Sequence, residues 1–151
     1  MESLELNEIK VLYHNLIHAW NNRNAKNMAN QFTEQGELIG FDGSQAIGRN
    51  TIFAHLEPIF AEHPTPPFTT CIKDVQFLST EVAMLRAIAG MIPPEGTELD
   101  SNFNAHQTLL AVKENDEWHI ELFQNTPAQF HGRPDLVEHM TAELKQAQNE
   151  D

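Results

Sequence analysis

The stretch that decides the fold is Trp118-His-Ile-Glu-Leu-Phe-Gln-Asn125, near the end of the chain. Its alternating pattern predicts a strand with one face in the core. The two expected faces carry Trp118, Ile120 and Leu122 on one side and His119, Glu121 and Phe123 on the other. Two amides, Gln124 and Asn125, then stand where the strand should end. A strand that packs in the core and ends in amides suits the wall of a small-molecule cavity.

Three further β-rich runs precede this strand, at residues 70–78, 81–92 and 105–113. Short turns at 79–80 and 114–116 favour antiparallel neighbours, whereas 93–104 is a longer polar loop. Three prolines between residues 63 and 68 predict a connecting loop before the first of these strands. The second half of the chain is therefore expected to be mostly sheet.

The first half predicts helices. An apolar stripe at intervals of three and four residues runs through Leu6, Ile9, Tyr13, Leu16 and Trp20. Asn24 is a suitable N-cap for a short second helix that includes Phe32 and ends at Gly36. Asn50 or Thr51 is expected to cap a third helix, which Pro58 should kink or interrupt.

A short hairpin is predicted between the second and third helices. Residues 37–41 form its first strand, Asp42-Gly43 its turn, residues 45–47 its return strand, and Gly48 its end. Helices followed by a curved antiparallel sheet indicate the α+β class, with the sheet wrapped over the long first helix as a cone.

The succession of these features resembles the nuclear-transport-factor-2-like superfamily, in particular its SnoaL-like branch with the SgcJ/EcaC group. The resemblance spans residues 4 to 131 and rests on Ala19-Trp20-Asn21, Phe32, the turn at 40–43, Gly48-Arg49, and Trp118 with residues 124–126. It implies a cone-shaped, cystatin-like α+β barrel with a ligand cavity between sheet and helices. It also implies a homodimer formed through the outer face of the sheet.

The resemblance divides the chain into a single SnoaL-like domain at 1–133 and an extension at 134–151. This extension is expected to contain an amphipathic helix and an acidic tail. Related proteins include polyketide cyclases, ketosteroid isomerases, dehydratases and epoxide hydrolases, so the fold predicts a pocket better than it predicts a reaction.

The catalytic carboxylate of the isomerase-like relatives falls here on Phe41, and Asp42 is explained by its turn. Histidine is the remaining acid/base candidate, because its usual pKa of about 6.5 suits proton transfer at neutral pH. His55 lies on the third helix and His106 begins the third long strand, so both are candidate catalytic residues. His14 and His18 have the spacing of a helical metal clamp but lack an adjacent glutamate, and no metal site is predicted.

Two further sets of residues are candidates for binding. The expected ligand contacts are Trp20, Phe41, Phe60, Phe103, Gln124 and Asn125. The expected dimer contacts are Arg86, His119, Glu121 and Phe123. Arg86 interrupts an apolar strand, so it either faces outward toward Glu121 or another subunit, or faces inward as an anion anchor.

The amino-acid composition limits the kinds of molecule that the protein is expected to bind. The 22 acidic and 9 basic residues give a formal charge of −13, which opposes binding to nucleic acid or to anionic membranes. A single cysteine, Cys71, and an acidic N-terminus without an apolar run predict cytoplasmic residence. Motifs for phosphate, flavin, nicotinamide or metal cofactors are absent from the sequence, so no cofactor is expected.

The main functional hypothesis is a protein that binds a small apolar or carbonyl-bearing molecule in its cavity. One alternative is a cofactor-free cyclase, isomerase or dehydratase, in which His55 or His106 transfers a proton while Gln124 and Asn125 orient the substrate. A second alternative is a non-catalytic homodimeric association domain. The sequence leaves enzymatic activity undecided among these.

Overall fold

Residues 3–149, which the computed structural model describes, contain four α-helices, one 3₁₀ turn and six strands. The helices are α1 (Leu4–Asn21), α2 (Ala25–Asn30), α3 (Arg49–Glu62) and α4 (Pro134–Asn149), and the 3₁₀ turn is η1 (Ser101–Phe103). The strands are β1 (Phe32–Ile39), β2 (Gln45–Ile47), β3 (Phe68–Phe77), β4 (Val82–Met91), β5 (Ala105–Glu114) and β6 (Glu117–Pro127). The predicted α+β class is confirmed.

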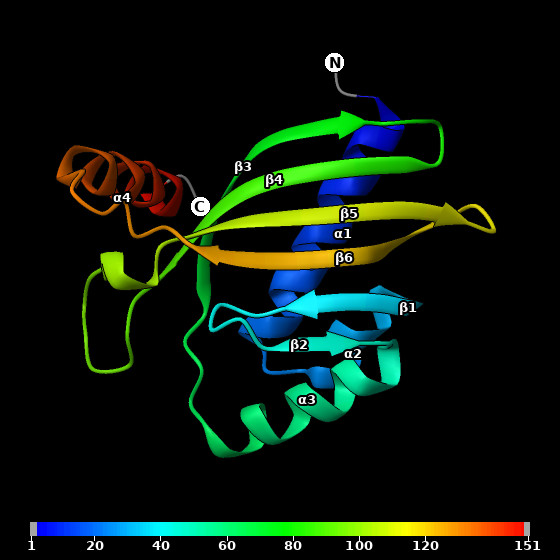
Figure 1. The fold of residues 1–151 in the computed structure, drawn as a ribbon, viewed down its shortest axis with the longest axis horizontal. Coiled ribbons are helices and arrows are strands. Elements are labelled where there is room, and N and C mark those ends of the chain that lie inside the picture. The colour runs from blue at the N-terminus through cyan, green and yellow to red at the C-terminus, as the bar shows by residue number, and fades with distance from the viewer. Residues whose placement is uncertain (1–2, 150–151) are drawn as a thin grey trace.

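The strands form one curved sheet in the order β2-β1-β6-β5-β4-β3, and α1 passes behind it in Figure 1. We call the side that faces α1 the inner face and the opposite side the outer face. All neighbouring strands in this sheet are antiparallel except β1 and β6, which run parallel. The expectation of a wholly antiparallel sheet is wrong at this pair. β1 and β6 are not joined by a hairpin, because α3 and four other strands lie between them in the sequence, and β6 enters the sheet in the same direction as β1.

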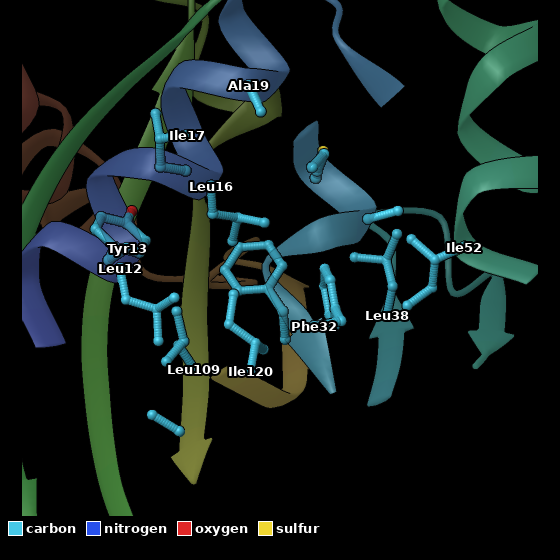
Figure 2. Packing of buried hydrophobic residues seen from close by; sticks show 14 of the residues in the cluster. Leu12, Tyr13, Leu16, Ile17, Ala19, Phe32, Leu38, Ile52, Leu109 and Ile120 are labelled. Atoms are coloured by element: carbon cyan, nitrogen blue, oxygen red, sulfur yellow. The ribbon is translucent and has the colours of Figure 1, made fainter. Parts of the chain in front are cut away.

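The first helix packs on the inner face as its apolar stripe predicts. Ser3 caps it by accepting a hydrogen bond of 3.0 Å from the backbone N–H of Leu6. Ile9, Tyr13 and Leu16 are fully buried, and Figure 2 shows residues of this helix packed against side chains of β1, β5 and β6. This packing forms the main hydrophobic core.

The second helix is shorter than predicted. Asn24 caps it, with Oδ1 accepting a 3.0 Å hydrogen bond from Asn27 N, but α2 ends at Asn30. Phe32 and Gly36 belong to β1 and not to the helix. At Gly36 the backbone lies so close to β6 that a Cβ would stand 2.8 Å from the carbonyl oxygen of Ile120. This glycine therefore permits a close approach of two strands instead of ending a helix.

The third helix differs from its prediction at its start, and Pro58 does not interrupt it. Gly48, with φ of +99°, occupies the N-cap position, so α3 begins at Arg49 before the predicted caps Asn50 and Thr51. Arg49 is held by hydrogen bonds of 3.1 and 2.7 Å from Nε and Nη2 to the Phe32 carbonyl. The helix then continues through Pro58 to Glu62 without interruption.

A β-bulge in β6 reverses the faces predicted beyond Ile120. Ala111 pairs with Ile120 and Leu110 pairs with Leu122, so Glu121 is an extra residue. Phe123 consequently points inward and is 1% exposed. The prediction that Phe123 lies on the outer face is wrong, because one inserted residue shifts the alternation of every later side chain.

The last helix covers part of the outer face. Met140 and Leu144 of α4 form a second small core with Ile88 and Ala128. Figure 1 shows α4 beside one end of β3 and β4, with much of the sheet left uncovered. The acidic tail predicted after this helix lies outside the described residues. No helix within residues 3–149 combines the length and apolarity needed to cross a membrane.

Candidate functional site

A cavity of about 300 Å³ lies among the inner face of the sheet, the end of α1 and one side of α3. Its aromatic lining consists of Trp20, Phe41, Phe68, Phe103 and Phe123. Its aliphatic lining consists of Met28, Leu38, Leu56, Ile59 and Met91. Its polar lining consists of Asp42, Ser44, His55 and Asn125. The cavity is thus a largely apolar space with a few polar groups, as small-molecule sites are.

Five predicted site residues line this cavity, namely Trp20, Phe41, His55, Phe103 and Asn125. Trp20 is fixed by a 3.0 Å hydrogen bond from its indole Nε1 to the Pro66 carbonyl. Phe41, in the β1–β2 turn, and Phe103, in η1, face each other with ring centroids 6.4 Å apart. The structure therefore brings these side chains together, and their binding of a ligand stays a prediction.

Two predicted ligand contacts lie away from the cavity. Phe60 packs edge-on against Trp20, with ring centroids 5.3 Å apart, and borders a surface groove between α2 and α3. Gln124 is adjacent in β6 to Phe123 and Asn125, which both line the cavity, so its side chain points to the outer face. Neither side chain lines the cavity wall.

The prediction of His106 as a cavity residue is wrong. Its neighbours in β5, Ala105 and Gln107, are buried on the inner face, so His106 projects from the outer face. There it stacks edge-on against Phe130, with ring centroids 6.3 Å apart. Burial lowers the pKa of His106, and the nearby positive charge of Arg86 lowers it further. His106 cannot reach a ligand in the cavity.

A buried polar chain leads from the core to the cavity wall. The Tyr13 hydroxyl donates a 2.5 Å hydrogen bond to Gln107 Oε1, and Gln107 Nε2 donates a 2.8 Å hydrogen bond to Asn125 Oδ1. Burial raises the pKa of Tyr13 well above its usual value, and an interaction with Thr70 opposes only part of this effect. Tyr13 therefore remains protonated and keeps its role as a donor.

Asp42 and His55 form the second polar group of the cavity. Asp42 Oδ1 accepts a 2.9 Å hydrogen bond from Ser44 N, which confirms the turn role predicted for this aspartate. This backbone hydrogen bond is the main reason that the pKa of Asp42 lies below its usual value, and His55 lowers it further by charge attraction. His55 thus lies within electrostatic range of a carboxylate that stays ionised.

Sequence reasoning missed Tyr13 and Gln107 as parts of the site. Tyr13 is indistinguishable in the α1 stripe from a core residue. A signal for Gln107 does exist, because it alternates with Ala105, Leu109 and Ala111 on the buried side of β5. An amide on such a face needs hydrogen-bond partners in the core.

The residues that the structure describes contain no group of three or more His, Cys, Asp or Glu side chains placed to hold a metal ion. The arrangement nevertheless supports two kinds of chemistry. An apolar cavity with an amide in its wall can bind and orient a small molecule. A histidine beside a carboxylate can transfer a proton to or from such a molecule.

A curved sheet over a long helix, with an apolar cavity between the sheet and the helices, defines the cystatin-like class of α+β proteins to which nuclear-transport-factor-2-like folds belong. Residues 9–124 match the SnoaL-like domain, so the chain belongs to the SnoaL-like family. This match leaves α4 outside the family domain. No protein of curated function matches the sequence.

Solved structures of other proteins share this fold. A cystatin-like domain of unknown function from Nostoc punctiforme is 21% identical with a TM-score of 0.80, over 92% of this chain and 86% of that one. A candidate calcium/calmodulin-dependent protein kinase type II association domain from Thiobacillus denitrificans is 13% identical with a TM-score of 0.71, over 80% and 94%. A candidate scytalone dehydratase from Novosphingobium aromaticivorans is 17% identical with a TM-score of 0.70, over 83% and 85%. At these identities the likeness shows the fold alone.

Proposed function

We propose that this protein binds a small, largely apolar molecule in the cavity between sheet and helices. The observation that carries the proposal is the composition of the wall, in which aromatic and aliphatic side chains surround a few polar groups. Burial of apolar ligand surface against such a wall supplies the affinity, and the polar groups supply the orientation. Membership of the SnoaL-like family supports the same function.

A fragment screen by NMR tests this proposal. Small aromatic compounds should shift backbone amide signals around the cavity in the wild-type protein. Ile59→Trp should weaken these shifts, because Ile59 lines the cavity and a larger side chain occupies part of its volume. Phe53→Trp is the matched control, since Phe53 lies on the same helix but borders the surface groove. Unchanged affinity in Ile59→Trp, or a complete lack of binding to the wild-type protein, would contradict the proposal.

His55 supports a catalytic version of the same function. It lines the cavity together with Asp42, whose carboxylate stays ionised. We therefore propose His55, and not His106, as the acid/base of any cyclase, isomerase or dehydratase reaction. In D₂O the wild-type protein should exchange hydrogens next to the carbonyl of a bound aromatic ketone. His55→Gln should lose this exchange while retaining ketone binding, and equal exchange in both would refute the role.

We further propose that two copies associate through the part of the outer face that α4 leaves uncovered. Leu110 is half-buried there, between its register neighbours Met84 and Leu122. Arg86 is exposed on the same face, opposite Thr108 and not Glu121, so an Arg86–Glu121 pair would have to form between subunits. The solved association domain of this fold supports the proposal. Light scattering at micromolar concentration should show a dimer that Leu110→Asp dissociates and Val11→Asp does not.

A further inference from the structure

We propose that Asn125 is held with its amino group toward the cavity, so that the ligand carries a hydrogen-bond acceptor at the end that meets β6. This inference rests on the proposed function and adds the chemical class of the ligand. It makes Asn125 the residue that selects the ligand and makes Gln107 a positioning residue.

The chain of hydrogen bonds begins with a fixed donor. Tyr13 is 0% exposed, and its hydroxyl lies 2.5 Å from Gln107 Oε1. A buried phenol that keeps its proton donates that proton to the available acceptor. The carbonyl end of Gln107 is therefore directed toward α1.

The orientation of Gln107 then determines that of Asn125. Gln107 is also 0% exposed, so water does not compete for its amide. With Oε1 occupied by Tyr13, its Nε2 amino group faces Asn125 Oδ1 at 2.8 Å. A side-chain amide has a carbonyl at one branch and an amino group at the other. Once Gln107 holds Oδ1, the Nδ2 amino group of Asn125 is turned away from it.

The amino group of Asn125 has no competing partner within residues 3–149. Asn125 lines the cavity, and its Nδ2 makes no hydrogen bond to any other described residue. Phe123 and Leu38 line the wall beside it without an acceptor, and the acceptors of Asp42 and Ser44 elsewhere in the lining make no hydrogen bond to Asn125. A ligand that covers this cavity-facing donor without accepting its hydrogen bond loses the bond that water can make there. A carbonyl, hydroxyl or carboxylate oxygen at this point restores it.

The size of the cavity defines the rest of the ligand. A dry cavity of about 150 Å³ accommodates benzene, so one of about 300 Å³ has room for a two-ring hydrocarbon body. The ligand that fits these observations has an apolar body and a terminal oxygen acceptor. The ligand atom opposite Asn125 must be a hydrogen-bond acceptor. An ammonium group there would place one donor against another, the Nδ2 amino group of Asn125.

Two isosteric probes test the inference. 2-Acetylnaphthalene carries a carbonyl oxygen where 2-isopropenylnaphthalene carries a methylene group, and their shapes are otherwise matched. Calorimetry should show at least tenfold tighter binding of the ketone to the wild-type protein. Asn125→Asp should abolish this preference, because its carboxylate presents only acceptors to the cavity. Gln124→Glu adds the same charge to the outer face of the same strand and should retain the preference.

A second measurement does not depend on the folding of a variant. The side-chain NH₂ signals of Asn125 should shift on addition of the ketone and much less on addition of the alkene. Equal affinity for both probes, or a ketone preference that persists in Asn125→Asp, would overturn the donor role while leaving small-molecule binding intact. Failure of both probes to bind would overturn this inference together with the proposed function.

Discussion

The side-chain amide of Gln107 donates a 2.8 Å hydrogen bond to Oδ1 of Asn125 on the neighbouring strand. The two residues are direct partners in the register of β5 and β6. Gln107 is enclosed in the core, whereas Asn125 borders the cavity. One hydrogen bond therefore connects the packing of α1 on the sheet to the polarity of the candidate binding site.

We predict that Gln107→Leu lowers the free energy of unfolding by about 1–3 kcal/mol, the cost of leaving a buried polar partner unsatisfied. Tyr13 and Asn125 both lose their partner in this variant. Urea denaturation measures the change. Gln124→Leu is the matched control, because it replaces a half-buried amide on the outer face, and its effect should stay within about 0.5 kcal/mol. Equal effects of the two substitutions would contradict the role of the buried chain.

Tyr13 provides a prediction at alkaline pH. Its pKa is raised by burial, so above about pH 10 the folded protein keeps a proton that the unfolded chain loses. The folded state then binds more protons than the unfolded state, and the free energy of unfolding falls as the pH rises. This chain has a single tyrosine, so absorbance at the phenolate band reports on Tyr13 alone. The phenolate signal should appear only together with unfolding, and its appearance in folded protein would refute the prediction.

Local periodicity explains why much of the fold is predictable. The buried stripe of α1 and the Asn24 cap depend on residues within a few positions of each other, and both are confirmed. The parallel pairing of β1 with β6 depends on residues far apart in the sequence, and no local pattern encodes it. The bulge at Glu121 leaves only a faint trace in the sequence, the adjacent apolar residues Leu122 and Phe123, which does not locate the extra residue.

The candidate site is less predictable than the fold for a related reason. Trp20, Phe41 and Asn125 are found because they lie at the ends of predicted elements, where the resemblance places a cavity. The roles of Tyr13 and Gln107 arise only from their contact, which joins residues 94 positions apart. The error at His106 has a different origin, because the sequence does contain the needed signal. His106 alternates with Ala105 and Gln107 in β5, and this alternation places its side chain on the outer face.

The close approach of β1 to β6 gives a prediction for Gly36. Gly36→Ala should destabilise the protein by about 1–3 kcal/mol, because the new Cβ would lie 2.8 Å from the backbone oxygen of Ile120 and force the strands apart. Gly40→Ala is the matched control, since its nearest contact, to Asp42 Oδ1, would be an ordinary 3.5 Å. Thermal denaturation of both variants measures the difference. A Gly36→Ala protein as stable as Gly40→Ala would show that the strands separate at no cost.

The outer face contains a coupled pair of charges that can be tested by titration. Burial lowers the pKa of His106 below its usual value of about 6.5, and the charge of Arg86 lowers it further. Arg86→Gln should therefore raise the pKa of His106, although burial should keep it below the usual value. Proton NMR of the imidazole ring measures this pKa, and Arg133→Gln, which removes a cation paired with Asp135 beyond the sheet, is the control.

The same pair contributes to how stability depends on pH below neutrality. Because the pKa of His106 is lower in the folded state, the unfolded chain binds more protons below about pH 6.5, and the free energy of unfolding falls as the pH decreases. Removing the charge of Arg86 brings the two pKa values closer together, so the loss of stability between about pH 6.5 and 5 should be shallower in Arg86→Gln than in the wild-type protein. An unchanged slope together with an unchanged pKa would show that His106 does not sense Arg86 and that its burial alone sets the pKa.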